Sequence, residues 1–349
     1  MGERKLIDHS KLELVNKDID ELQANPTQES DTSCFIVKTA NQWINEAKSR
    51  PIPNMLFDKL WFEDELCILF ADTNVGKSIL AVQIADSISK GKPVDGFEIE
   101  THPKKVAYLD FELSDKQFEK RYSDNYKDHH VFHENFLRVE INPELEVPKD
   151  FKDFEDFLCH SIIGLIETHG ARVIIIDNIT YLKNDNERAK DALGLMKLLK
   201  GINKKYNVSI LVLAHTPKRD DSKPLSKNDL AGSKMLMNFC DSAFAIGSSA
   251  SMPSVRYIKQ IKQRNTEQVF HQENVAVCKI ENPHNFLKFI FEDFGSESEH
   301  LKQYKASDLS DRDNQILEMK EEGLPNTQIA ERLGVSEGTV RLALKRLNQ

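Results

Sequence analysis

The feature that most constrains the fold is an apolar run leading directly into a loop that contains glycine and lysine. Leu66 to Phe70 is a continuous apolar segment of the kind that forms a buried strand. It is followed by Ala71-Asp72-Thr73-Asn74-Val75-Gly76-Lys77-Ser78-Ile79, and apolar residues then recur at helical spacing up to Gly91. This order places the loop at a helix N-terminus, where backbone N–H groups attract phosphate. The pattern predicts an ATP-binding loop, with Lys77 at the β- and γ-phosphates and the Ser78 hydroxyl on Mg²⁺.

One residue departs from this loop motif, because Ala71 stands where a first glycine is expected. An alanine fits at that position if its φ is negative, so nucleotide binding remains the prediction. The alternative is an ordinary strand, turn and helix with a lysine at the helix start.

Length and composition describe a globular protein, with one large α/β domain and one small module or with two medium domains. The chain has 349 residues, of which 40% are hydrophobic and 30% charged. No apolar run approaches the roughly 18 residues of a membrane span, and the first residues lack the apolar core of a signal peptide, so we expect a cytoplasmic protein without membrane contact. The net charge of −9 argues against broad, nonspecific nucleic-acid binding, but it permits local basic surfaces.

Four regions are expected along the chain. Residues 1–59 form a flexible N-terminal segment with a short helix, and residues 60–294 alternate strands with helices. Such alternation predicts a mostly parallel sheet covered by helices on both faces, and the last strands, which lack intervening helices, predict an antiparallel C-terminal extension. A polar linker over 295–308 then leads to an all-α helix-turn-helix module over 309–349.

Polar residues follow three of the predicted strands. Asp177 ends the apolar run Val173 to Ile176 and is expected to hold the Mg²⁺ shell together with Ser78. Asp110 and Glu112 end an earlier strand, and period-2 alternation places both on one face. Either can orient the attacking water. Glu112 is preferred because it lies nearer the crevice at the strand ends.

A third strand ends in a histidine. His215 follows the apolar run Ile210 to Ala214, where it can sense the γ-phosphate. The alternative is a hydrogen-bonded histidine at the sheet edge.

The segments Ala71–Ser78, Asp110–Glu112, Ile176–Asn178, Ala214–Thr216 and Lys262–Arg264 together resemble the RecA-like P-loop ATPases. Within these, the chain resembles the plasmid RepA type of hexameric helicase and related mobile-element ATPases, over residues 60–294. The resemblance implies a homo-oligomer such as a hexamer, with Glu112 as catalytic carboxylate, Asp177 in the magnesium shell and His215 as phosphate sensor. It also implies that Lys262 and Arg264 are cationic fingers at the γ-phosphate of a neighbouring subunit. The alternative for those two residues is a solvated polar strand face.

The loop over residues 217–228 carries basic residues that include Lys218 and Arg219. In RecA-like motors the corresponding loop touches single-stranded nucleic acid, so these two side chains are expected to follow a phosphate backbone. A plain surface loop is the alternative.

The stretch Gly323–Arg341 resembles the helix-turn-helix of response regulators and sigma factors. The resemblance places Ser336, Thr339 and Arg341 where a recognition helix meets the base edges of duplex DNA. Lys345 and Arg346 are then expected to pair with phosphates. A protein-docking module is the alternative.

These features together favour a Mg²⁺-dependent ATPase that acts on DNA, as a helicase or remodelling ATPase in replication or mobilisation of a mobile element. Two other classes remain open. One is a transcriptional regulator switched by ATP, and the other is a KaiC-like signalling ATPase with a protein-docking tail.

Overall fold

The computed structural model describes residues 35–142, 144, 146–179, 188–217, 219–230, 233–303 and 306–347. The chain divides into two units, residues 1–52 and 53–349. In the first unit, α2 (Ala40–Lys48) begins with a capping box in which Thr39 and Gln42 satisfy each other's backbone N–H groups. Trp43 and Ile44 on this helix are exposed.

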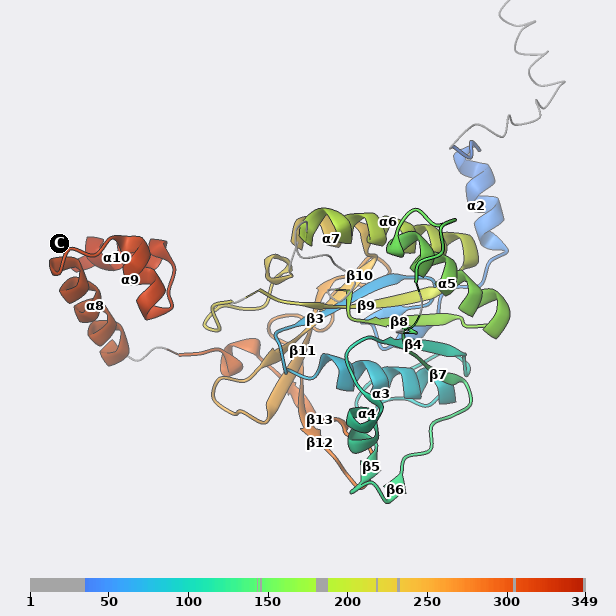
Figure 1. Ribbon diagram of the computed structural model, residues 1–349, viewed down its shortest axis with the longest axis horizontal. Helices are drawn as coiled ribbons and strands as arrows, with labels where there is room; N and C mark the ends of the chain where they lie inside the picture. The colour runs from blue at the N-terminus through green and yellow to red at the C-terminus, as the bar shows by residue number, and fades with distance from the viewer. Residues whose placement is uncertain are drawn as a thin grey trace, which may run out of the picture. The chain divides into compact units, whose positions relative to one another are not determined.

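The second unit is built on a nine-stranded sheet of order β13-β12-β11-β10-β3-β9-β8-β4-β7 (Figure 1). Its strands are β3 (Leu66–Ala71), β4 (Val106–Asp110), β7 (Phe136–Val139), β8 (Val173–Asp177), β9 (Ser209–His215), β10 (Ser242–Ser248), β11 (Val255–Lys262), β12 (Val275–Glu281) and β13 (Lys288–Gly295). Pairing is parallel from β10 through β7 and antiparallel from β10 through β13. The predicted α/β class, with an antiparallel C-terminal extension, is therefore confirmed.

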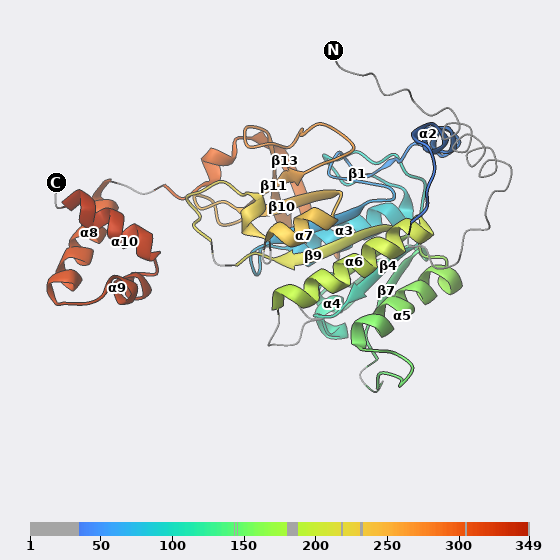
Figure 2. The same ribbon diagram turned by 90° about the horizontal axis from the view of Figure 1, so that it is seen from above.

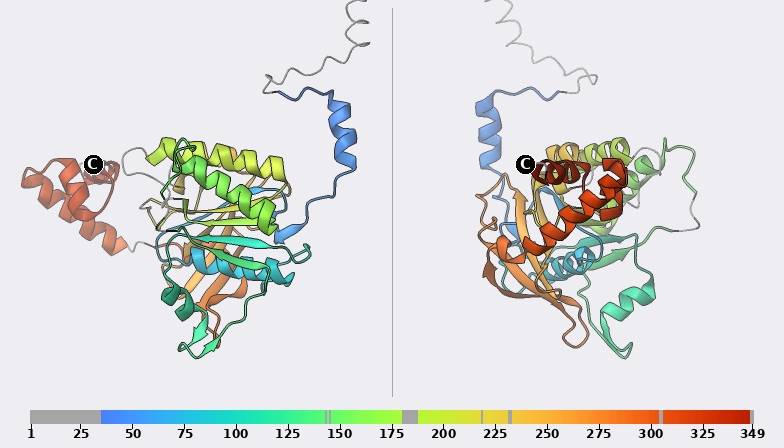
Figure 3. Two further views of the ribbon diagram at one scale, coloured as in Figure 1. Left: turned by 45° about the vertical axis from the view of Figure 1, so that its right-hand side comes forward. Right: turned by 90° about the vertical axis from the view of Figure 1, so that its left-hand side faces the viewer.

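Helices cover both faces of the parallel part of the sheet (Figures 2 and 3). The helices that pack around this sheet, within the described residues, are α3 (Lys77–Lys90), α4 (Asp115–Arg121), α5 (Phe154–His169), α6 (Arg188–Tyr206) and α7 (Ser233–Phe239). Alternate residues of β3 separate the two cores: Leu66, Ile68 and Phe70 pack with α5, α6 and α7, whereas Cys67 and Leu69 pack with α3. Continuous apolar strands are the expected composition for a sheet buried on both faces.

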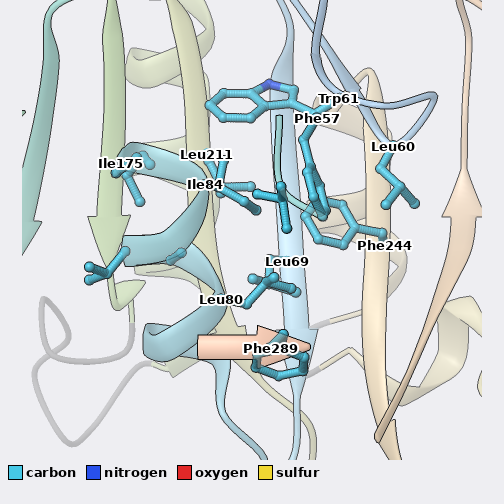
Figure 4. Close-up of a cluster of buried hydrophobic side chains, with 14 of the residues drawn as sticks. Phe57, Leu60, Trp61, Leu69, Leu80, Ile84, Ile175, Leu211, Phe244 and Phe289 are labelled. Atoms are coloured by element: carbon cyan, nitrogen blue, oxygen red, sulfur yellow. The ribbon is translucent and has the colours of Figure 1, made fainter. Parts of the chain in front are cut away.

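The core on the α3 side also takes in residues that precede the expected domain start (Figure 4). The short strands β1 (Met55–Phe57) and β2 (Trp61–Phe62) contribute Phe57 and Trp61, both almost fully buried. The packed domain therefore begins before the predicted boundary at residue 60, because β1 and β2, two short apolar strands, form a hairpin there. Another small hairpin joins β5 (Ser123–Asp124) and β6 (Asp128–His129).

Side-chain amide bonds join α3 to the antiparallel extension. Gln83 donates to the carbonyl of Phe289 over 2.9 Å and accepts the Phe289 N–H over 2.8 Å, inside the protein. The glutamine thus satisfies both backbone groups of one β13 residue. It fixes to that strand the helix α3, which follows the predicted ATP-binding loop over residues 71–79 (the phosphate loop).

A buried charge organises the end of the sheet domain, at the 3₁₀ helix η3 (Glu297–His300). The Glu297 carboxylate accepts from Lys259 Nζ over 2.5 Å and from the backbone N–H of Leu225 over 2.6 Å. Lys259 also donates to the Leu225 carbonyl over 2.9 Å, just before the 3₁₀ helix η2 (Lys227–Asp229). The predicted linker over 295–308 therefore begins inside the packed domain. The sequence suggested a linker because the segment is polar, but its Glu297 is buried.

The C-terminal module contains α8 (Ala306–Glu321), α9 (Asn326–Leu333) and α10 (Glu337–Leu347). Its core is formed by Ile316, Ile329, Ala330, Val340 and Ala343, with Gly334 in a left-handed conformation at the end of α9. These helices confirm the predicted helix-turn-helix architecture. Throughout the part of the chain that the structure describes, every helix is too short or too polar to cross a membrane.

Candidate active site

The phosphate loop lies between β3 and α3, at the centre of the sheet. Ala71 is the last residue of β3 and has strand backbone, whereas the left-handed conformations in this loop fall on Asn74 (φ 61°) and Gly76 (φ 110°). An alanine therefore fits at position 71 without strain. The φ of Gly76 is one that residues with a side chain rarely adopt, so the backbone conformation favours glycine here, and a Cβ would also require the tip of Ile280, 2.7 Å away, to shift.

Lys77 is buried at the start of α3, and its ammonium lies over the end of β3. Its Nζ donates to the carbonyls of Ala71 over 3.0 Å and Asp72 over 2.9 Å. It also lies 3.0 Å from Nδ1 of His215, the last residue of β9. Burial lowers the pKa of Lys77.

Asp177 at the end of β8 presents a carboxylate oxygen suited to a metal ion. Its Oδ2 accepts the Tyr108 hydroxyl over 2.5 Å, whereas Oδ1 is buried without a hydrogen-bond partner among the described residues. Burial raises the pKa of Asp177 to about 6, against the opposing influence of the Ser78 and Tyr108 hydroxyls. An orphaned carboxylate oxygen near a serine hydroxyl is a donor set that Mg²⁺ takes, so the residues fit the predicted metal.

Glu112 lies beside two polar side chains from neighbouring strands. Asn178 Nδ2 donates to Glu112 Oε1, and the same nitrogen lies 3.0 Å from His215 Nε2. His215 Nε2 is 3.7 Å from Glu112 Oε1, and hydrogen bonding with His215 lowers the pKa of Glu112. The structure thus links Lys77, His215, Asn178 and Glu112 in one polar chain.

Asp110, the alternative carboxylate, points elsewhere. Its Oδ2 accepts from Arg138 Nε over 2.9 Å, and it is almost fully buried. The expectation that Asp110 and Glu112 share a face by strand alternation was wrong, because β4 ends at Asp110 and Glu112 lies in the turn that follows.

The two predicted fingers do not lie at the phosphate loop of their own chain. Lys262 pairs with Ala243 in β10, and the neighbouring Ser242 pairs with Cys67 near the amino end of β3. Both predicted fingers therefore lie near the amino ends of the parallel strands, whereas the phosphate loop lies at their carboxyl ends. Lys262 Nζ donates to the carbonyls of Met237 and Cys240, and Arg264 Nη1 lies 3.3 Å from Asp241 Oδ1.

The predicted single-strand contacts receive little support from the structure. Lys218 lies outside the described residues. The Arg219 side chain is only 9% exposed, lies near Asp221 and donates to the Lys223 carbonyl. A phosphate contact by Arg219 requires it to leave these partners.

The five predicted duplex contacts lie on or next to α10. The Ser336 hydroxyl accepts the Thr339 N–H over 3.1 Å and so caps this helix. Arg341 pairs with Glu337 over 2.8 Å, and Arg346 pairs with Asp313 over 3.0 Å. Lys345 is exposed.

Four residues at or near the site were not assigned a role from the sequence: Tyr108, Asn178, Arg138 and Arg256. Asn178 directly follows Asp177, and this adjacency was the available signal. Tyr108 and Arg138 lie within strands, with no pattern that marks them. Arg256 of β11 donates to the Val75 carbonyl of the phosphate loop over 3.2 Å, a contact that only the fold creates.

Comparison with known proteins places this chain in a family. Residues 34–221 match the family described as AAA domain, and residues 307–349 match the family described as bacterial regulatory proteins, luxR family. The first match spans more than half of the sequence, so the chain belongs to the AAA domain family. It is an ATPase-type chain with a helix-turn-helix of the luxR class at its C-terminus. The more specific RepA-type helicase family remains a prediction.

Two further comparisons complete this picture. Among solved structures, a KaiC-like protein from the hyperthermophilic archaeon Pyrococcus horikoshii OT3 is 14% identical, with a TM-score of 0.45. The similarity covers 66% of this chain and 91% of that chain. No curated protein matches the sequence.

Proposed function

We propose that this protein is a Mg²⁺-dependent ATP hydrolase whose nucleotide state controls duplex-DNA binding by its C-terminal helices. The observation that supports hydrolysis is the meeting of Lys77, Asp177, His215 and Glu112 at one edge of the sheet. Asp177 and His215 end the strands β8 and β9, Glu112 lies just past the end of β4, and Lys77 begins α3 after the loop that follows β3; these four strands are neighbours in the sheet. This is the carboxyl edge, where ligands of open α/β sheets bind.

Each residue has a role set by its contacts. Mg²⁺, held by Ser78 and Asp177, would neutralise charge on the β- and γ-phosphates. Lys77 binds those phosphates in place of its present carbonyl partners. Glu112 orients the water whose oxygen attacks the γ-phosphorus as the β–γ bridging bond breaks, and its Oε1 takes the water proton. Its lowered pKa keeps it ionised for this role.

Self-assembly is part of this proposal. Arg264 lies at the edge opposite its own phosphate loop, and its side chain is 55% exposed. A guanidinium there can act on a γ-phosphate only in a neighbouring subunit, as arginine fingers supplied in trans do. We therefore propose a homo-oligomer, with Lys262 supporting Arg264 from its contacts with α7.

The match to the luxR family favours an ATP-switched DNA-binding regulator as the biological role. A second candidate is the helicase or remodelling ATPase of a mobile element. The position of Arg264 favours this candidate, because fingers between subunits also serve ring-forming motors. The burial of Arg219 argues against it, since a motor needs contacts to single-stranded DNA.

ATP turnover and DNA affinity distinguish the two candidates. We would measure hydrolysis alone, with single-stranded DNA and with a random-sequence duplex pool, and duplex affinity with ADP or a non-hydrolysable ATP analogue. A switch is expected to change duplex affinity by about 5- to 150-fold between nucleotides, with little stimulation by single strands. Strong stimulation by single-stranded DNA, with duplex affinity independent of nucleotide, would reject the switch in favour of the motor.

A further inference from the structure

The turn that carries Glu112 is held by hydrogen bonds that its backbone N–H groups donate to Asp110. This aspartate is 3% exposed, and its Oδ1 accepts the backbone N–H groups of Glu112 over 3.2 Å and Leu113 over 3.0 Å. An aspartate that accepts from the following backbone N–H groups fixes the direction in which the chain leaves a strand. The first residue of the turn is fixed from the other side, because the Phe111 N–H donates to the Asp177 carbonyl over 2.9 Å.

Arg138 closes the turn from the neighbouring strand β7, where it pairs with Tyr108 of β4. Its Nε donates to Asp110 Oδ2 over 2.9 Å and its Nη2 to the Leu113 carbonyl over 2.7 Å. Nη1 reaches Asp115 at the start of α4 over 2.7 Å. The guanidinium also lies 4.6 Å from the centre of the Phe118 ring. One planar side chain therefore holds the start, the middle and the end of the segment over residues 110–115.

We propose that Arg138 and Asp110 are positioning residues for ATP hydrolysis, which set where the Glu112 carboxylate lies without touching nucleotide. This inference rests on the proposed catalytic role of Glu112. Glu112 is beyond the end of β4, so the sheet alone does not fix it, and its side chain is 40% exposed. The clamp of Arg138 and Asp110 makes the turn rigid, so that Glu112 meets His215 and Asn178 in one arrangement.

Positioning predicts a specific kinetic pattern. Arg138→Met removes the guanidinium and its hydrogen bonds but leaves Lys77, Ser78 and Asp177 in place, so we expect ATP binding to be retained. A misplacement of about 1 Å costs on the order of 100-fold in rate, and we expect a kcat loss of about 10- to 100-fold with KM changed by less than about threefold. Asp110→Asn keeps an oxygen for the two N–H groups, and it is expected to lose less than Asp110→Ala.

Paired variants separate positioning from a merely structural role. Lys116→Ala is the matched control, because it removes the Lys116–Glu119 ion pair on α4 without touching the clamp, and its kcat is expected to be parental. Arg138→Met is also measured in a Glu112→Gln background, in single-turnover hydrolysis of labelled ATP. If Arg138 acts through Glu112, the second change adds less than about a twofold loss there.

Three outcomes would contradict the proposal that Arg138 and Asp110 position Glu112. They are a parental kcat in Arg138→Met, a loss that multiplies fully with that of Glu112→Gln, or a rise in KM as large as the fall in kcat. Failure of the proposed function has a different signature, because it requires Glu112→Gln itself to hydrolyse ATP at the parental rate. Thermal unfolding of each variant establishes that the fold is retained at the assay temperature.

Discussion

At the residue scale, the proposed nucleotide site assigns binding and turnover to separate groups. Lys77→Ala removes the cation expected at the β- and γ-phosphates, so both ATP affinity and hydrolysis should fall. Glu112→Gln keeps the phosphate loop and removes the base, so ATP should bind with parental affinity while kcat falls by about 100-fold or more. Fluorescent-nucleotide titration and phosphate release measure the two effects. Equal rates for parent and Glu112→Gln would exclude Glu112 from catalysis.

Two glycines provide a contrasting pair of alanine substitutions. Gly76 has φ 110°, and a Cβ there would displace the tip of Ile280, so Gly76→Ala is expected to destabilise the fold by about 1–3 kcal/mol and to weaken ATP binding. Gly164 lies within α5, and a Cβ there meets nothing within 4 Å, so Gly164→Ala is expected to stabilise by about 0.5–1 kcal/mol. Urea denaturation measures both. A neutral Gly76→Ala would contradict the strained-loop argument.

Only some of the candidate site residues could be predicted from the sequence. The phosphate loop and the ends of β8 and β9 could be located, because a buried parallel strand followed by a polar residue is a local pattern. The directions of Asp110 and Glu112 could not be assigned, since they depend on where β4 stops and on Arg138 of another strand. The spacing of residues along the sequence does not reveal contacts of this kind between distant strands.

At the scale of elements, the bond between α3 and β13 is open to a direct test. Gln83→Ala leaves the N–H and carbonyl of Phe289 without their buried partner, and unmet buried groups of this kind cost about 1–3 kcal/mol each. We expect a loss of about 2–5 kcal/mol in the free energy of unfolding. Gln272→Ala, at an exposed position, serves as the control and should stay within about 0.5 kcal/mol. Equal stability of the two variants would contradict the bracing role of Gln83.

The elements themselves were largely predictable, and their limits were not. Apolar periodicity and capping signals indicated the parallel strands, the helices α3 to α6 and the three C-terminal helices, whereas α7 was not predicted. The β1–β2 hairpin and η3 were assigned to the regions that flank the domain. The hairpin strands are too short to show a pattern, and a glutamate such as Glu297 is normally expected at the surface. Burial of a charge is decided by partners distant in the chain, here Lys259 and Leu225.

At the scale of the whole molecule, activity should depend on a neighbouring subunit. Arg264→Ala is expected to bind ATP and lose hydrolysis, and Lys77→Ala is expected to lose hydrolysis by failing to bind. A mixed oligomer of the two contains interfaces with an intact loop facing an intact finger, so mixing should restore part of the rate. Light scattering establishes that mixed oligomers form. No recovery at any ratio would exclude action of Arg264 between subunits.

The C-terminal module should contribute duplex binding of two kinds. Arg341→Ala removes a contact worth about 1–3 kcal/mol if it reads a guanine, and the loss should differ between DNA sequences. Lys345→Ala should weaken all duplexes alike and lower the salt dependence of binding by about one unit of slope. Binding assays across a salt series measure both. If the double variant Arg341→Ala/Lys345→Ala binds duplex DNA with the affinity of the parent, the module is assigned to protein docking instead.

Glu297 also gives the sheet domain a mechanical property. Residue 225, in the loop after β9, and η3, which precedes the C-terminal module, share one carboxylate and one ammonium within the protein. Separating them would strand a buried charge, and breaking such a pair is strongly destabilising. The loop at Leu225 and the helix η3 are therefore expected to move together rather than independently, because any separation of them exposes Glu297 and Lys259 to the loss of their buried partners.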